Sequence, residues 1–113
     1  MSIKDDANIF AEAVKKCPEV IQLQEANKIL MANEASRKLL DEFRIVQVDA
    51  YNEKMQSGDV SQATKEKFTR FTKLMIEHPE FGNYLMAEQK FGPVWEEVMN
   101  IINGAVGIGS TSK

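Results

Sequence analysis

The sequence contains few of the residues that usually build catalytic, metal or disulfide sites. Its 113 residues include one cysteine, Cys17, and one histidine, His78. A single cysteine excludes an internal disulfide framework. One cysteine and one histidine also provide too few ligands for a zinc or iron–sulfur centre within one chain. We therefore expect no metal and no cofactor.

Long apolar runs and a strong excess of one charge are also absent. No stretch approaches the roughly 20 apolar residues of a membrane span, and the start of the chain, MSIKDDANIF, lacks the apolar core of a signal peptide. The 14 basic and 17 acidic residues give a net charge of −3, whereas nucleic-acid-binding proteins usually carry a basic excess. We expect a cytoplasmic protein without a membrane partner.

Glycine and proline are scarce, which favours long uninterrupted elements. The chain has six glycines and three prolines, and no segment of useful length alternates apolar and polar residues as a strand would. We predict an all-α fold of about five helices, arranged as an antiparallel helical bundle or as hairpins, with long third and fifth helices. The predicted helices are residues 5–16, 18–32, 34–56, 62–77 and 79–104.

Capping residues define these boundaries. Asn33 and Ser61 are predicted N-caps, because their side chains accept hydrogen bonds from free backbone N–H groups. Gly58 suits the left-handed position that follows a helix. Gly92-Pro93 interrupts the fifth helix, and we expect a kink or two shorter helices there, because an interior proline removes a hydrogen bond and clashes with the preceding turn.

One domain accounts for a chain of this length. We predict a single helical domain over residues 1–106 and a flexible tail over residues 107–113. The terminal GAVGIGSTSK spaces Gly104 and Gly109 as a P-loop does, but Ser110 stands where the P-loop has lysine. A P-loop also follows a strand, so we interpret this segment as the end of a helix and a tail.

No catalytic group is recognisable, and we predict that the protein is not an enzyme. Histidine is the commonest general base, but His78 lies at a predicted helix junction with no nucleophile motif near it. We interpret it as a capping or solvent-exposed residue. Adjacent carboxylates such as Asp41-Glu42 point in different directions on a helix and do not form a shared acid–base site.

Apolar surface is the clearest functional signal in the sequence. The fifth helix carries a near-heptad apolar stripe, and such stripes commonly pair with another subunit. We therefore predict a homo-oligomer, a dimer or larger, or a complex with another protein. Glu88 lies on this stripe, where we expect it to pair with a lysine or arginine from another helix. The predicted interface residues are Phe81, Tyr84, Leu85, Glu88, Phe91 and Trp95.

A basic run in the fourth helix provides the alternative. Lys65, Lys67, Arg70 and Lys73 have one acid, Glu66, among them. Such a run can contact phosphates, although it is more often a solvated helix face. The alternative to a protein-binding role is therefore a direct RNA-binding module, while the charge balance makes nucleic-acid binding the less favoured reading.

Three blocks of sequence resemble the YlbF/YmcA family of small bacterial helical proteins, and the similarity is closest to its YheA-like branch. The blocks are NEASRKLLDEFRIVQ, KMQSGD and HPEFGNYLMAEQKFGPVWEEVMNII. The order and spacing of the blocks carry the resemblance, which extends over residues 8–103. The matching features are the Asn33-capped helix with Leu40, Phe43 and Gln47, the turn from Met55 to Gly58, and the series Pro79, Tyr84, Glu88 and Phe91.

The resemblance implies an all-helical protein that self-associates. Better-known relatives act in competence, sporulation and biofilm development, as accessory subunits of a complex that modulates an endoribonuclease initiating mRNA processing and decay. Some of them carry iron–sulfur clusters on cysteines, which does not transfer to a chain with Cys17 alone. Our hypothesis is a non-enzymatic adaptor that acts through helix-mediated contacts in bacterial RNA processing or developmental regulation.

Overall fold

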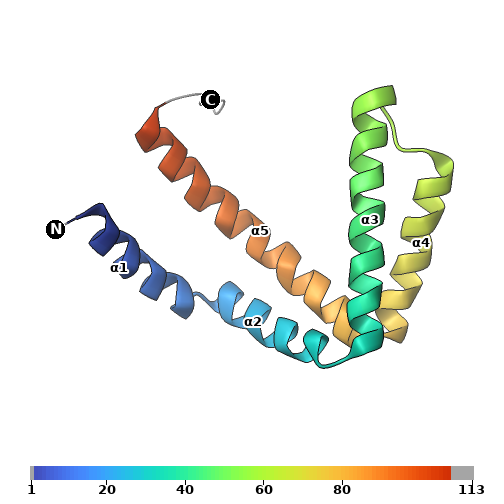
Figure 1. Ribbon diagram of the computed structural model, residues 1–113, viewed down its shortest axis with the longest axis horizontal. Coiled ribbons are helices and arrows are strands. Elements are labelled where there is room, and N and C mark those ends of the chain that lie inside the picture. The colour runs from blue at the N-terminus through green and yellow to red at the C-terminus, as the bar shows by residue number, and fades with distance from the viewer. Residues whose placement is uncertain (1, 108–113) are drawn as a thin grey trace. The chain divides into compact units, whose positions relative to one another are not determined.

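A computed structural model describes residues 2–107, and within this range the chain is helical without strands (Figure 1). The all-α prediction is therefore confirmed, and every predicted helix end lies within two residues of the observed one. The helices are α1 (Ile3–Lys16), α2 (Pro18–Met31), α3 (Glu34–Ser57), α4 (Gln62–Glu77) and α5 (Pro79–Val106).

The predicted caps are confirmed at three helix ends. The Asn33 side chain accepts a hydrogen bond from the Ser36 N–H at 2.8 Å, and the Ser61 hydroxyl accepts one from the Thr64 N–H at 3.2 Å. Gly58 follows α3 with φ 88°, in the left-handed region. These bonds satisfy backbone groups that a helix end leaves without an intrahelical partner.

Pro93 does not divide α5, so of the two predicted alternatives the two shorter helices are excluded and the kink stays a prediction. The helix runs from Pro79 to Val106 with Pro93 in its interior. Proline removes only its own N–H from the hydrogen-bond ladder, and the residues on both sides can continue it. Apart from its chain neighbours and the backbone of α5 itself, no atom lies within 4 Å of the place where a Cβ on Gly92 would stand.

The chain packs as two compact units, which are described separately. Unit 1 comprises Met1–Glu25 and Met86–Lys113, and unit 2 comprises Ala26–Leu85. A single domain over residues 1–106 stays a prediction. The predicted tail, residues 107–113, lies outside the described residues except for Gly107, which follows α5 with φ 71°.

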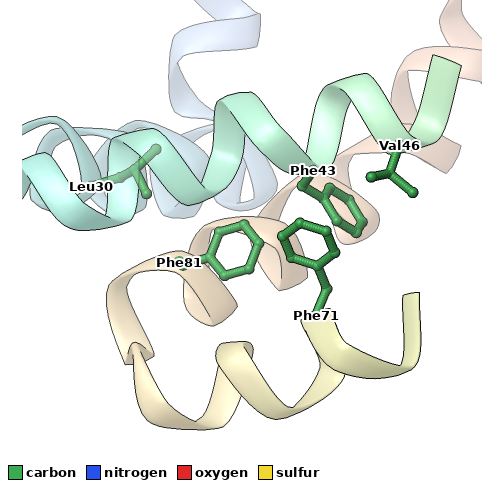
Figure 2. Packing of buried hydrophobic residues seen from close by; sticks show 5 residues of the cluster. All are labelled: Leu30, Phe43, Val46, Phe71 and Phe81. Carbon is green, nitrogen blue, oxygen red and sulfur yellow. The ribbon is translucent and has the colours of Figure 1, made fainter. Parts of the chain in front are cut away.

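Unit 2 has an aromatic core between α3, α4 and the start of α5. Phe43 packs edge-on against Phe71, with ring centroids 5.3 Å apart. It also meets the rings of Phe68 and Phe81, each at 5.9 Å. Figure 2 shows the Phe43 ring facing those of Phe71 and Phe81. Leu30 and Val46 complete the buried cluster.

A glycine allows α5 to begin close to the end of α4. A Cβ on Gly82 would lie 2.6 Å from the carbonyl oxygen of Met75, which is shorter than side chains tolerate. His78 forms the turn between the two helices: its N–H donates to the Leu74 carbonyl at 2.8 Å. Its carbonyl accepts from the Phe81 N–H at 3.0 Å. The backbone of His78 therefore caps α4, as the sequence predicts.

A carboxylate joins the end of α3 to the start of α4. Glu53 accepts a hydrogen bond from the Ser61 N–H at 2.9 Å and another from the Thr64 hydroxyl at 2.8 Å. These two bonds favour the ionised form and lower the pKa of Glu53 below its ordinary value. Thr64 is buried, so the contact fixes the α3–α4 hairpin at its loop.

Candidate protein-docking site

Unit 1 is formed by two amphipathic segments. On α1, Phe10, Ala13 and Val14 follow the i, i+3, i+4 spacing that places side chains on one face. On α5, Val94, Trp95 and the residues that follow at helical spacing form the second apolar face. Trp95 also stacks on Phe91, with ring centroids 5.9 Å apart and an angle of 26° between the ring planes.

An apolar hollow lies between these segments of unit 1 and is open to solvent. Its volume is about 130 Å³, comparable to a cavity of about 150 Å³ that binds a benzene molecule. The hollow can therefore receive about one large side chain. It is lined by Phe10, Ala13, Val14, Cys17, Val20, Phe91, Val94, Trp95 and Val98.

Among the described residues of unit 1, Ala87 is the one buried apolar side chain, whereas unit 2 has a buried cluster. None of the α1 residues is buried, and Trp95 retains 43% of its surface although it lines the hollow. A partner that covers this exposed apolar surface would remove it from water, with a favourable free energy of about 25 cal/mol per Å². The other large apolar side chains of unit 1 that stay exposed are Ile3, Ile9, Phe10, Ile21, Met86, Ile101, Ile102 and Val106.

Cys17 brings a polar pair to the edge of the hollow. It is half-buried between α1 and α2, and its thiol donates to the Glu19 carboxylate with a distance of 3.1 Å from Sγ to Oε1. This bond, together with a backbone N–H, lowers the pKa of Glu19. A carboxylate acceptor therefore lies next to an otherwise apolar surface.

The predicted interface residues divide between the two units. Phe81 is 0% exposed, at the centre of the unit 2 core. The same chain therefore covers this side chain, which apolar periodicity alone could not show, and its place in an interface stays a prediction. Tyr84 and Leu85 are half-buried against the same core.

The remaining predicted interface residues belong to unit 1. Phe91 and Trp95 both line the hollow, and Glu88 is half-buried. The pairing of Glu88 with a basic side chain stays a prediction. The residues of α1 that line the hollow were absent from the predicted site, although Phe10 and Val14 carried a helical spacing that could have indicated them.

The basic run of α4 does not form a compact patch. At about 100° per residue, Lys65, Lys67, Arg70 and Lys73 spread over an arc of about 200°. Glu66 falls inside this arc. The Lys65 ammonium lies 4.0 Å from Asp59, and the Arg70 guanidinium lies over the Phe71 ring at 5.7 Å. All four basic residues are exposed, which also fits a solvated helix face.

Within residues 2–107, none of the helices combines the length and the apolar character needed to cross a membrane. In the same part of the chain, no three His, Cys, Asp or Glu side chains are grouped so that they could hold a metal ion. Exposed apolar surface is thus the feature of the described residues that is best suited to binding a partner.

A family model described as "Control of competence regulator ComK, YlbF/YmcA" matches residues 3–107. The chain belongs to the YlbF/YmcA family. This confirms the resemblance drawn from the sequence blocks. The family description is regulatory and names no reaction.

Relatives align with this YlbF/YmcA chain over almost their whole length. A UPF0342 protein of Clostridium novyi is 38% identical over 106 residues, which cover 94% of this chain and 93% of the relative. A UPF0342 protein of Clostridium tetani is 32% identical and covers 96% and 93%. One from Halothermothrix orenii is 26% identical and covers 98% and 94%. No solved structure matches the chain.

Proposed function

We propose that this YlbF/YmcA protein is a non-enzymatic regulatory adaptor that self-associates and binds protein partners through helix faces. The observation that carries the proposal is the open apolar face of unit 1, with its hollow of about 130 Å³ and the exposed Trp95. Exposed apolar surface of this kind marks interaction sites in soluble proteins. We place the adaptor in bacterial RNA processing or developmental control, as the family description and the sequence resemblance suggest.

The physical mechanism is docking of an apolar helix face onto α1 and α5. Aromatic side chains in partly covered pockets are typical binding hot spots, and Phe91 and Trp95 occupy such a position. A carboxylate introduced at Trp95 would have to be desolvated in a complex, which is unfavourable without a partner charge. Trp95→Glu is therefore the variant that separates docking from folding.

The proposal is tested by crosslinked capture of tagged protein from its own cells. We expect native protein, but not Trp95→Glu, to recover defined subunits of the ribonuclease machinery, identified by mass spectrometry. Asn100→Glu, an exposed change on another face of α5, is the matched control and should behave as native. Equal recovery of those subunits by native protein and Trp95→Glu would reject this face, and recovery of the protein alone would reject the adaptor role.

Direct RNA binding is the second candidate, and the exposure of the four basic residues of α4 favours it. Its signature is salt-dependent affinity, because bound phosphates release counterions. A variant with Lys65, Lys67, Arg70 and Lys73 changed to Glu should then lose RNA binding measured by fluorescence anisotropy at low salt. Absence of binding by the native protein at low salt would exclude this candidate.

A further inference from the structure

α3 carries a second apolar face that the core of unit 2 does not use. Ile45, Val48, Tyr51 and Met55 retain 57–69% of their surface. At about 100° per residue, these side chains fall within an arc of about 120° on α3. The buried Phe43 projects outside that arc. We call these four exposed residues the α3 stripe.

The α3 stripe is uncharged from its first to its last residue, and the exposed Asn52 is the polar residue that falls within its arc. Asp49, Glu53 and Lys54, which occur between its first and last residues, project outside the arc. Single exposed apolar residues are common and need no explanation, whereas a contiguous group marks an interaction site. The stripe extends over about 15 Å of helix, a length that suits contact with a second helical surface.

Unit 1 offers a surface with the complementary properties. Its hollow is lined almost wholly by apolar atoms and holds about one large side chain. The end of α5 from Val98 to Gly107 contains no charged residue. Tyr51 is the largest side chain of the α3 stripe and is 66% exposed. A tyrosine also needs a hydrogen-bond partner for its hydroxyl when it is covered, and the Glu19 carboxylate accepts from the thiol of Cys17, which lines the hollow.

We propose that the α3 stripe of one copy docks onto the unit 1 face of a second copy, and that Tyr51 enters the partner's hollow. This inference rests on the self-association in the proposed function and specifies its geometry. Each copy has one stripe and one hollow, so a two-fold axis satisfies both surfaces twice and closes the assembly at two chains. Among assemblies of two chains, the same pairing without a two-fold axis would leave one stripe and one hollow unused.

The areas agree with a closed pair. Each of the four side chains of the stripe has a surface area of about 150 Å². Because somewhat more than half of this area is exposed, the stripe presents on the order of 350 Å² to a partner. One such contact, counted on both sides, is as small as typical crystal contacts, which bury less than about 800 Å². Two symmetric contacts double this total and reach the range of about 1,200–2,000 Å² found for stable interfaces.

A mixing experiment tests the pairing. Val48→Glu places a carboxylate in the stripe, and Trp95→Glu places one at the hollow. Each variant alone carries the charge in both contacts, and we expect its dimerisation to weaken about 100-fold or more, measured by analytical ultracentrifugation. In an equimolar mixture, the mixed dimer retains one contact between unaltered surfaces. The two introduced carboxylates meet in the other contact, so we expect the mixture to associate more weakly than native protein but more tightly than either variant alone.

Matched controls separate docking from folding. Gln47→Glu adds a carboxylate to α3 outside the stripe and can still accept the hydrogen bond from Arg44, whose Nη1 lies 3.0 Å from Gln47 Oε1. Asn100→Glu does the same on α5 away from Trp95. Both should dimerise as native protein does. Helical circular dichroism and the urea midpoint identify a variant that has unfolded. In that case, Tyr51→Ala replaces Val48→Glu, and Ile102→Glu replaces Trp95→Glu.

A measurement on native protein gives an independent answer. Chains labelled with ¹⁵N and unlabelled chains are mixed, and an amine-reactive crosslinker is added. We expect mixed-isotope crosslinks from Lys38 or Lys54 of α3 to lysines of unit 1, namely Lys15, Lys16 or Lys90. Mixed-isotope links that join α3 only to α3, together with a variant mixture that associates no more tightly than either variant alone, would overturn the proposed pairing.

The outcomes also separate this inference from the proposed function. A native protein that stays monomeric at all concentrations would overturn both the inference and the self-association. A dimer that Trp95→Glu disrupts but Val48→Glu leaves unchanged would overturn the inference alone, because the unit 1 face would then bind something other than the α3 stripe.

Discussion

Gly82 is the residue at which the backbone itself limits the choice of side chain. We expect Gly82→Ala to lower the free energy of unfolding by about 1–3 kcal/mol, because the new methyl group would press against the Met75 carbonyl oxygen and force the helices apart. Urea denaturation followed by circular dichroism measures this change. Gly104→Ala is the control, since no atom lies within 4 Å of its added Cβ, and it should cause no loss. Equal stability of the two variants would contradict the close approach.

Glu53 makes stability depend on pH in a defined direction. Its two hydrogen bonds lower its pKa in the folded protein, so its contribution is present above the pKa of the unfolded chain and is lost as the pH falls through the folded value. Glu53→Gln should therefore be less stable than native protein at neutral pH, and the difference should shrink in acid. Urea midpoints across this range measure it, with the exposed Glu42→Gln as control. A difference that stays constant with pH would argue against the ionised contact.

At the scale of the helices, the start of α3 depends on one side chain. Asn33→Ala removes the acceptor for the Ser36 N–H and should cost about 1 kcal/mol of stability. Asn33→Asp restores an acceptor and should regain most of this loss. Chemical denaturation of the three proteins checks both statements, and an alanine variant as stable as the aspartate variant would show that the cap contributes nothing.

Helix ends were predictable because they depend on local chemistry. Asn33, Ser61 and Gly58 act through groups a few residues away, and the sequence therefore specifies them. The capping box of Ser2 and Asp5, in which each side chain accepts from the other's N–H, begins α1 two residues before the predicted start. It was missed because Ser2 lies outside the apolar pattern that indicated the helix.

Tertiary partners were less predictable than helix ends. The burial of Phe81 depends on Phe43 and Phe71, which are distant in sequence. The hollow requires α1 and α5 together. The α3 stripe was not predicted because the same helix also carries the core residues Phe43 and Val46. In a helix with two apolar faces, the apolar residues do not follow one spacing that would indicate a single buried face.

At the scale of the whole molecule, folding and assembly should be coupled. If copies cover each other's apolar faces, the folded state is stabilised by mass action, and the thermal midpoint rises with protein concentration. We expect this rise for native protein in scanning calorimetry and its absence for Trp95→Glu. A midpoint of native protein that does not change over a hundredfold range of concentration would contradict the coupling.

The lack of buried residues on α1 has a consequence for the lifetime of the chain. A helix held by few covered contacts opens with little cost, and segments of this kind are the first to exchange amide hydrogens or to enter a protease. Cleavage of such segments follows the population of the open form. We therefore expect a copy without a partner to be the short-lived form, so that ordinary proteolysis would remove surplus subunits without a dedicated signal.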